Sequence, residues 1–468
     1  MKSELLSFAV VACVLTITLS AAAEPRPNFL FIYTDDQRWD AMGVVQREQG
    51  DQARFPWFTT PNLDRLATEG VRFRNAFVTL SLCSPSRAAF LTGRYNHLNG
   101  VPDNFTQFPT NSMTYATQLR AAGYTAAYIG KWHMVNQRGQ RPGFDYSASF
   151  IGQGQYQNCP FEINGVLTNT TGWVDDVVTD YAIKQLQKLK DCPFAMIVGF
   201  KSPHEPWDPP ARAAQRFTNV TLRPVANLHL PPPGEPDTEA INFNDSHNLN
   251  YFRVISAVDD NLGRILHTLD DLHLATNTVV VFTSDNGFFR GEHGLHDKRY
   301  LYDESVRIPF IIRYPKLIQQ PRALDDLILN LDLCPTFLEL AGVAVPNGVQ
   351  GRSLVPLLAG RKTDWRQSFL SEYFTELYYP SVPPQYGLRT QTAKLIKYPG
   401  HDDWTEMFDL AVDPYETKNL ANNPAHREMR AKLETELVAQ QRATDFKTPP
   451  PTNIKPPPNK TKNLETVD

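Results

Sequence analysis

Four short apolar runs in this chain share one feature: each ends in polar residues that are capable of chemistry. The runs occupy 28–37, 124–133, 194–204 and 277–287. They are rich in β-branched and aromatic residues and are flanked by turn residues, a pattern typical of strands that are buried on both faces. Helical patterns lie between them. Alternating strands and helices predict an α/β fold with a large, mostly parallel sheet that is sandwiched by helices.

The helical patterns cover 63–69, 113–122, 177–189 and 250–272, and Gly123 is placed to end the second one. From about residue 364 the pattern changes to short strand-like segments, which an amphipathic helix follows at 424–441. This change predicts a smaller C-terminal α+β subdomain with an antiparallel sheet. The predicted organisation is a signal peptide at 1–23, a catalytic α/β domain at 24–363, the subdomain at 364–447 and a proline-rich tail at 448–468.

The first residues are typical of a secretory signal peptide. Lys2 precedes an apolar run from Leu5 to Leu19, and small residues up to Ala23 follow it. We expect cleavage near Ala23 and export to a secreted, periplasmic or lysosomal-type compartment, with an uncleaved signal anchor as the alternative. No other apolar run is long enough to span a bilayer, so no stable membrane insertion is expected. The net charge of −4 gives no field that would attract nucleic acid.

Export permits disulfides and glycosylation. Four cysteines remain once Cys13 leaves with the signal peptide. If Cys83 has another task, at most one intramolecular disulfide forms, and Cys159 with Cys192 is the pairing that we expect. Sequons for N-glycosylation occur at Asn104, Asn169, Asn219, Asn244 and Asn459.

The polar residues at the ends of the four runs predict one crevice, because ligands of open α/β sheets bind beyond the carboxyl ends of the strands. These residues are Asp35, Asp36, Lys131, His133, His204, Asp285 and Asn286. Three carboxylates and an amide oxygen are hard donors, which favour Ca²⁺ or Mg²⁺ over Zn²⁺. One calcium ion is favoured, because so many carboxylates replace most of its water, whereas magnesium usually keeps several waters.

A further stretch, "SPSRAAFLTG", predicts a short helix with Ser84 as its N-cap, Pro85 as its first residue and Gly93 at its end. Cys83 then lies just before the helix N-terminus, where unpaired N–H groups favour an anion. Arg87, one turn later, adds a planar cation suited to an oxyanion. A buried apolar cysteine, or half of a disulfide, is the alternative interpretation of Cys83 alone.

The stretch from Cys83 to Arg94 resembles the sulfatase signature C-x-P-S-R followed by T-G-R. Further segments similar to sulfatases follow in the family's order, among them "PNFLFIYTDDQ", "AAGYTAAYIGKWH", "FKSPHEPW", "FTSDNGFFRGEHGLHDK" and "MFDLAVDPYETKNLA". The resemblance covers roughly 27–421. It implies that a formylglycine-generating enzyme converts Cys83 to formylglycine, whose hydrated aldehyde is the nucleophile of a sulfuric ester hydrolase.

The resemblance also implies roles for individual residues. Calcium is held by Asp35, Asp36, Asp285, Asn286 and the modified Cys83. Arg87 and Lys131 stabilise the hydrate and the metal site, and His133 is the base that takes a proton from the hydrate. His204 and Lys298 contact the sulfate ester and assist departure of the alcohol.

A sulfated carbohydrate is the substrate that the resemblance favours, including members that remove 6-O-sulfate from N-acetylglucosamine. His296 and Trp207 are expected to contact it beside Lys131, His204 and Lys298, and Trp39 and Trp132 are further candidates for stacking on a sugar. For His293 two roles are considered: contact with the substrate, or support of the residues that contact it. Two other functions are considered: a phosphonate or phosphodiester hydrolase of the same superfamily, and a non-catalytic secreted glycoprotein.

Overall fold

The computed structural model describes residues 26–235, 246–376 and 378–450. The expected signal peptide, the tail from residue 451 and the sequons at Asn244 and Asn459 lie outside the described residues. None of the helices in the described ranges combines the length and the apolar composition needed to cross a bilayer.

A ten-stranded sheet forms the centre of the described structure. In spatial order it contains β13 (Arg322–Leu324), β2 (Val71–Phe73), β12 (Phe310–Arg313), β9 (Thr278–Ser284), β1 (Asn28–Thr34), β8 (Phe194–Gly199), β4 (Thr125–Lys131), β5 (Tyr146–Phe150), β6 (Phe161–Ile163) and β7 (Val166–Thr168). The five strands from β9 to β5 are parallel, whereas β12, β6 and the pairing of β6 with β7 are antiparallel. The prediction of a mostly parallel sheet is confirmed.

The four apolar runs form four neighbouring strands, β9, β1, β8 and β4. The last residues of these strands lie opposite one another. Tyr33 of β1 lies opposite Gly199 of β8 and Thr283 of β9, and Gly130 of β4 lies opposite Gly199. Because these strands are parallel and in step, their carboxyl ends lie at the same edge of the sheet.

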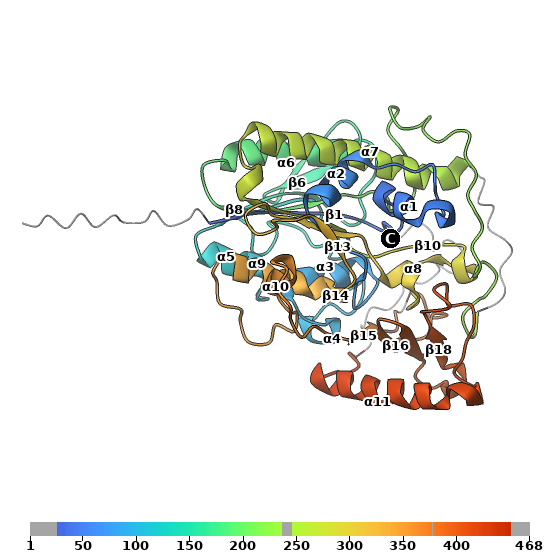
Figure 1. Cartoon of the computed structure of the whole chain (residues 1–468). Coiled ribbons are helices and arrows are strands. Elements are labelled where there is room, and N and C mark those ends of the chain that lie inside the picture. The colour runs from blue at the N-terminus through green and yellow to red at the C-terminus, as the bar shows by residue number, and fades with distance from the viewer. Residues whose placement is uncertain (1–25, 236–245, 377, 451–468) are drawn as a thin grey trace, which may run out of the picture.

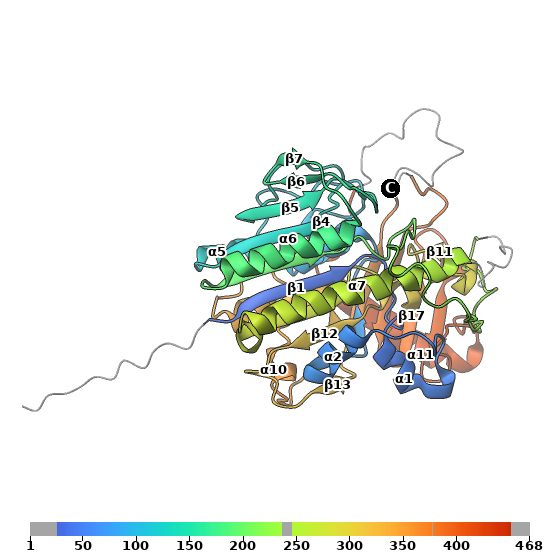
Figure 2. The same cartoon turned by 90° about the horizontal axis from the view of Figure 1, so that it is seen from above.

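Helices cover both faces of this sheet (Figure 1). One face carries α2 (Pro61–Glu69), α6 (Val174–Leu189) and α7 (Ser246–Asp271). Seen from above, α6 and α7 run alongside the strands β4 and β1 (Figure 2). The other face carries α3 (Cys83–Thr92), α5 (Tyr115–Ala121) and α9 (Leu333–Leu340). The strands therefore alternate between two apolar cores: Leu30 and Ile32 belong to one, and Phe29, Phe31 and Tyr33 belong to the other.

Several short elements connect these layers. They are α1 (Gly43–Gln49), α4 (Asn96–Asn99), α8 (Asp303–Val306) and α10 (Val355–Leu358), with the two-residue strand pairs β10 (Phe289–Arg290) with β11 (His296–Asp297) and β3 (Ala76–Phe77) with β14 (Ile328–Leu329).

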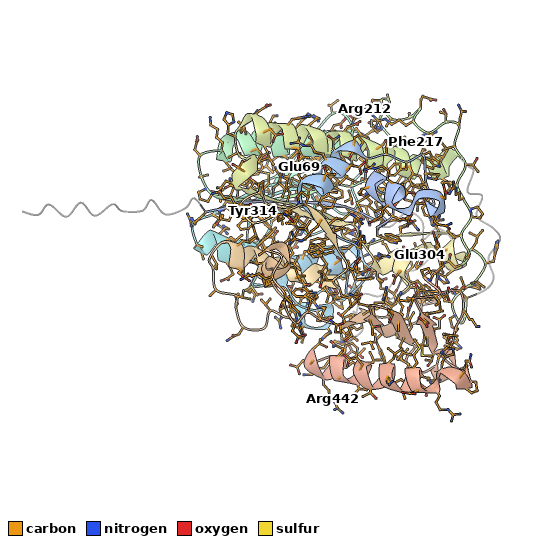
Figure 3. The ribbon with its side chains drawn as sticks, viewed as in Figure 1. Glu69, Arg212, Phe217, Glu304, Tyr314 and Arg442 are labelled. Atoms are coloured by element: carbon orange, nitrogen blue, oxygen red, sulfur yellow. The ribbon has the colours of Figure 1, made fainter. Side chains whose placement is uncertain are left out.

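The antiparallel sheet expected near the C-terminus is present. It consists of β15 (Ser368–Tyr373), β16 (Gln385–Thr390), β17 (Ala393–Lys397) and β18 (Glu406–Asp409), and α11 (Arg427–Ala443) packs on it. Side chains fill the space between this sheet and the main one (Figure 3). Leu370, Leu388 and Leu433 share one apolar core with Phe31 of the main sheet. The residue numbers given above for the domain boundaries stay a prediction.

The expected disulfide is not formed. Cys159 and Cys192 are both free, and so are Cys83 and Cys334. Cys159 is buried, and its sulfur accepts a hydrogen bond from the backbone N–H of Gln155 at 3.5 Å, whereas Cys192 is exposed after α6. The two thiols therefore lie in different environments.

Candidate active site

Polar side chains from four strand ends meet at the carboxyl edge of the main sheet. Asp35 and Asp36 follow β1, and Asp285 follows β9. Asp36 has a φ of 70°, in the left-handed region, so the chain turns sharply directly after the strand. This turn lets two adjacent carboxylates reach the same place. Asp35, Asp36 and Asp285 offer carboxylate oxygens that lie within 4.8 Å of one another, and all three side chains are buried.

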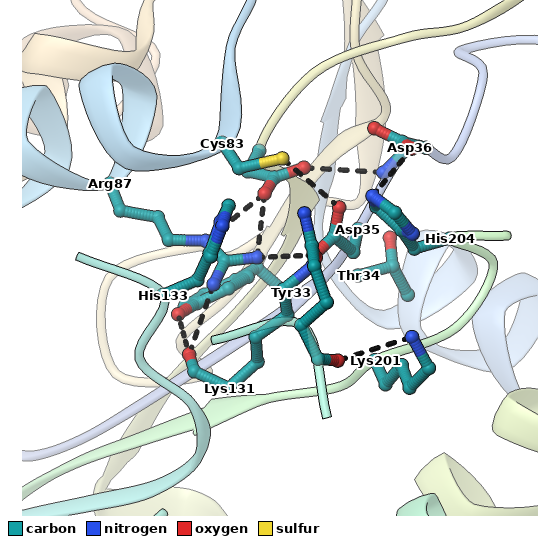
Figure 4. A network of polar contacts seen from close by, with 12 residues as sticks. Tyr33, Thr34, Asp35, Asp36, Cys83, Arg87, Lys131, His133, Lys201 and His204 are labelled. Atoms are coloured by element: carbon teal, nitrogen blue, oxygen red, sulfur yellow. Dashed lines mark hydrogen bonds and ion pairs between the residues drawn. The ribbon is translucent and has the colours of Figure 1, made fainter. Parts of the chain in front are cut away.

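Three cations lie against these three carboxylates. Two of them, Arg87 and Lys131, are seen beside Asp35 in Figure 4. The Arg87 guanidinium contacts Asp285 Oδ2 at 2.7 Å and Asp35 Oδ2 at 2.5 Å. Lys131 Nζ forms an ion pair with Asp35, and Lys298 Nζ lies 2.7 Å from Asp36 Oδ1. A buried charge is costly unless it is paired. Each carboxylate therefore has a cationic partner, which lowers the cost of burying these groups.

The thiol of Cys83 lies inside this cluster. Its Sγ is 3.5 Å from Asp35 Oδ1 and 3.3 Å from Lys298 Nζ, and the residue is fully buried. Burial, and then the charge of Asp35, raise the pKa of the thiol well above its usual value. An unmodified thiol at this position therefore stays protonated near neutral pH and is a poor nucleophile.

The helix that carries Cys83 begins two residues earlier than expected. Cys83 is the first residue of α3 and Leu82 is the N-cap, so Cys83 does not precede the helix and Ser84 is not its cap. The Ser84 hydroxyl instead donates to the backbone carbonyl of His133 at 2.5 Å. This tertiary contact with the segment after β4 holds the start of α3 against the strand that carries Lys131. The predicted end of the helix at Gly93, with a φ of 66°, is confirmed.

The carboxylates have very different pKa values. Burial raises the pKa of Asp36 to about 7, and the like charges of Asp35 and Asp285 add to this. Burial and Asp35 also raise the pKa of Asp285. For Asp35, burial is outweighed by Lys131 and Arg87, so its pKa lies well below the usual range. Asp35 is therefore ionised near neutral pH, whereas Asp36 still binds a proton part of the time. The neighbouring cations alone do not keep all three carboxylates charged.

The donor set fits a hard divalent cation. Asp35, Asp36 and Asp285 supply carboxylate oxygens, and the side-chain oxygen Oδ1 of Asn286 is buried without a hydrogen-bond partner. An unpartnered buried oxygen costs free energy, which a bound cation would recover. A cation would also favour the charged forms of Asp36 and Asp285. All these donors are oxygens, which suits Ca²⁺ better than Zn²⁺.

Two histidines face the cluster. His204 Nε2 lies 3.9 Å from Asp36 Oδ2, and its Nδ1 lies 2.8 Å from the backbone carbonyl of Glu205. A carbonyl accepts only, so Nδ1 carries the hydrogen and Nε2 faces the site. His133 has a φ of 45°, and its Nδ1 is buried without a partner. Burial and the charge of Lys131 hold the pKa of both histidines well below its usual value.

Two expected substrate-contacting residues lie further out. His296 is half exposed, and its Nε2 lies 3.1 Å from Glu205 Oε1 at the rim of the site. Trp207 is only 3% exposed, and its indole N–H donates to the Pro203 carbonyl at 2.7 Å. Its ring packs against Tyr251, so its place is in the core and it has no open face for a sugar. Trp132, 1% exposed, is likewise a core residue.

His293 does not face the acidic cluster. It is buried and stacks on Tyr302 with ring centroids 3.7 Å apart, while its two ring nitrogens contact Asn227 and the carbonyl of Leu230. Its place is therefore a supporting one, between the segment after β9 and the C-terminal sheet.

Sequence reasoning missed several residues that hold the site together. Gln153, in the loop after β5, accepts a hydrogen bond from Lys131 Nζ through its side chain and one from Lys201 Nζ through its carbonyl at 3.1 Å. Asp175 of α6 accepts hydrogen bonds from the backbone N–H groups of Lys201 and Ser202, at 2.8 and 3.1 Å. It thereby fixes the loop that carries His204. The signal that could have found Asp175 was an acidic residue just before the helix predicted at 177–189, whereas Gln153 had no such signal.

The parallel sheet brings together a cysteine at a helix N-terminus, an acidic cluster and several fixed cations. This combination is typical of enzymes that act on anionic esters. The model of the sulfatase family matches residues 27–343, and the model described as N-sulphoglucosamine sulphohydrolase, C-terminal, matches residues 291–443. The chain therefore belongs to the sulfatase family and is a sulfuric ester hydrolase.

Individual relatives agree with this assignment. The chain is 33% identical to an N-acetylglucosamine-6-O-sulfatase of Bacteroides thetaiotaomicron, over 89% of this chain and 88% of the relative. It is 30% identical to an ulvan-active sulfatase of Formosa agariphila, over 92% and 84% of the two chains. A solved structure of a protein in complex with its substrate D-glucosamine-2-N,6-O-disulfate superposes with a TM-score of 0.81, at 32% identity, and covers 90% of this chain and 98% of that one.

Proposed function

We propose that this sulfatase removes sulfate from a sulfated carbohydrate, with a formylglycine derived from Cys83 as nucleophile and one calcium ion held by Asp35, Asp36, Asp285 and Asn286. One observation carries the proposal: Cys83 Sγ lies 3.5 Å from Asp35 and 3.3 Å from Lys298, within the acidic cluster. The calcium ion would supply Lewis-acid stabilisation of the sulfuryl oxygens, and the modified side chain would supply a hydroxyl nucleophile that a thiol lacks.

The fixed cations suit a sulfate ester. Attack at sulfur moves negative charge onto the bridging oxygen and the sulfuryl oxygens. Lys298 lies 3.3 Å from Cys83, and Lys131 and Arg87 are paired with Asp35, which itself lies 3.5 Å from Cys83. Because buried carboxylates hold these cations in place, they need no reorganisation when this charge develops. Preorganised charges in a water-excluded site are usually the largest single contribution to catalysis.

The histidines suit proton transfer. Because Nδ1 of His204 donates to the Glu205 carbonyl, its Nε2 is the atom that would carry a proton to the leaving alcohol. A bound sulfate group raises the pKa of a neighbouring imidazole and so favours the protonated acid. Neutral His133, with its buried and unpartnered Nδ1, is suited to accept a proton near Cys83. Each such proton transfer typically contributes about 10²–10⁴-fold in rate.

Support for a carbohydrate substrate comes from the relatives. One is named N-acetylglucosamine-6-O-sulfatase, another is named ulvan-active sulfatase, and the superposed structure holds D-glucosamine-2-N,6-O-disulfate. We therefore propose 6-O-sulfated N-acetylglucosamine as the first substrate to test. Buried Trp207 and Trp132 offer no stacking surface, so contacts to the sugar have to come from other residues of the rim.

The test compares matched esters. The protein with its modified Cys83 is assayed against 4-nitrophenyl sulfate, 4-nitrophenyl phosphate and N-acetylglucosamine 6-sulfate, and the peptide that contains Cys83 is weighed by mass spectrometry. We expect release of sulfate from both sulfate esters, much slower phosphate release, and a Cys83 peptide with the mass of the aldehyde. Faster cleavage of the phosphate ester, or an unmodified thiol in active protein, would overturn the proposal.

A further inference from the structure

The C-terminal sheet contributes a buried carboxylate to the surroundings of the active site. Glu376 lies three residues after β15 and is 0% exposed. Its Oε2 accepts hydrogen bonds from Arg299 Nε at 2.7 Å and from the hydroxyl of Tyr373 at 3.0 Å. Its Oε1 lies 3.5 Å from the backbone N of Asn104. One carboxylate therefore joins three segments that are far apart in the chain.

The first link leads to Lys298. Arg299 follows it directly, and its side chain is held on two sides, by Glu376 and by an ion pair with Asp297. The guanidinium also lies over the ring of Tyr379, 3.2 Å from the ring centroid. Because Arg299 is fixed in this way, the backbone of Lys298 is fixed beside it. Lys298 Nζ can then reach both Asp36 and Cys83.

The second link leads to Cys83. The side-chain oxygen of Asn104 accepts a hydrogen bond from the backbone N–H of Ser84 at 3.0 Å. Ser84 N–H belongs to the first turn of α3, where N–H groups have no partner within the helix. Asn104 thus acts as a substitute cap for the helix whose first residue is Cys83, and Glu376 holds the backbone of Asn104.

We propose that Glu376 is a positioning residue of the active site, which sets Lys298 through Arg299 and Cys83 through Asn104. The inference rests on the proposed function of Cys83 and Lys298. It explains why a sheet that supplies no group to the acidic cluster lies against the catalytic segments. Mispositioning by about 1 Å from a distant change costs roughly 10²-fold in rate.

The test uses Glu376→Gln in the full, modified protein. The amide keeps the shape of the side chain but loses the charge that Arg299 needs. We expect kcat to fall about 10- to 100-fold, with KM within about threefold of the wild type, because the defect lies in the alignment of reacting groups and not in substrate binding.

Asp332→Asn is the matched control. Asp332 is also 0% exposed, and it forms a comparable ion pair with Arg366 from the C-terminal part of the chain. Its carboxylate otherwise accepts from the backbone N–H groups of Leu329 and Arg352, which carry no group of the acidic cluster. We expect this variant to lose thermal stability to a similar degree and to keep its kcat. Equal loss of kcat in both variants, or an unchanged kcat in Glu376→Gln, would overturn the inference.

Two outcomes separate this inference from the proposed function. If the wild type hydrolyses no sulfate ester, the proposed function fails first. If the wild type is active and Glu376→Gln does not fold, Arg299→Lys tests the same link, because a lysine keeps the charge but loses the geometry of the guanidinium. A folded Arg299→Lys variant with wild-type kcat would then refute the positioning role.

Discussion

Glu406 shows how one buried side chain makes the stability of the whole protein depend on pH. It lies in β18 and accepts hydrogen bonds from the hydroxyls of Tyr302, at 2.9 Å, and Tyr398, at 2.6 Å. Burial raises the pKa of Glu406 to about 7, although both hydrogen bonds lower it. The folded protein therefore binds a proton here at pH values where the unfolded chain has already lost it.

The sign of the effect follows from this difference. Between the ordinary pKa of a glutamate, about 4.3, and about 7, the folded state binds more protons, so this group makes the free energy of unfolding fall as the pH rises. In Glu406→Gln the free energy of unfolding should not show this decrease. The difference in unfolding free energy between the variant and the wild type should therefore shift in favour of the variant by on the order of 1 kcal/mol per pH unit in that window. Urea unfolding of both proteins at pH 5, 6, 7 and 8 measures it. Parallel pH profiles would contradict the prediction.

At the same scale, the sequence identified the residues that strand ends position. The ends of the four predicted apolar runs carry Asp35, Asp36, Lys131, His133, His204 and Asp285, and all of these residues lie at one edge of the sheet. Gln153 and Glu376 could not be found in this way. They lie in loops without a local pattern, and their partners Lys131 and Arg299 become neighbours only in the folded chain.

At the scale of elements, two glycines let the central strands approach each other at the edge that carries the site. Gly130 of β4 lies opposite Gly199 of β8 and has a φ of 95°. A Cβ atom at Gly130 would overlap the backbone carbonyl of Gly199, which cannot move without breaking the pairing of β8 with β1. Lys131 follows Gly130 directly, so the position of the lysine depends on this close pairing.

We expect Gly130→Ala to destabilise the protein by more than about 4 kcal/mol, or to prevent its folding, because it adds a backbone clash to an unfavourable φ. Gly139→Ala is the control: Gly139 has a φ of 87°, but a Cβ atom there would meet nothing within 4 Å. This variant should lose only about 1–2 kcal/mol from the left-handed conformation. Thermal unfolding compares the two variants, and similar losses would show that the clash is unimportant.

The elements themselves were largely predictable, because their patterns are local. The four central strands and the long helix α7 (Ser246–Asp271) have strong apolar periodicity, and they are found where the sequence predicts them. The start of α3 lies two residues before the predicted one, because Ser84 hydrogen-bonds to His133 across the fold and does not cap its own helix. Tertiary contacts of this kind override local capping preferences.

At the scale of the whole molecule, the site collects segments from Asp35 to Glu376, so that nearly the whole described chain has to fold before its charges meet. The three buried carboxylates of the cluster are balanced by three cations only in the folded state. A ligand that binds this arrangement has no comparable site in the unfolded chain. Binding at the acidic cluster should therefore stabilise the entire fold.

The proposed calcium site makes this expectation measurable. A cation that binds only the folded state adds RT ln(1 + [L]/Kd) to the free energy of unfolding, about 2.7 kcal/mol at one hundred times its Kd. We expect the midpoint of thermal unfolding to fall in excess chelator and to rise steadily with free Ca²⁺ once that exceeds its Kd. The effect of Mg²⁺ should be weaker, because magnesium gives up its water reluctantly. Asp285→Asn removes one carboxylate from the cluster and should abolish most of the calcium dependence. Asp332→Asn, which removes a carboxylate that is not part of the cluster, should shift the midpoint without changing that dependence. An unfolding midpoint that stays constant from chelator to millimolar calcium would refute a calcium ion at these carboxylates, because their burial would then be balanced by Arg87, Lys131 and Lys298 alone.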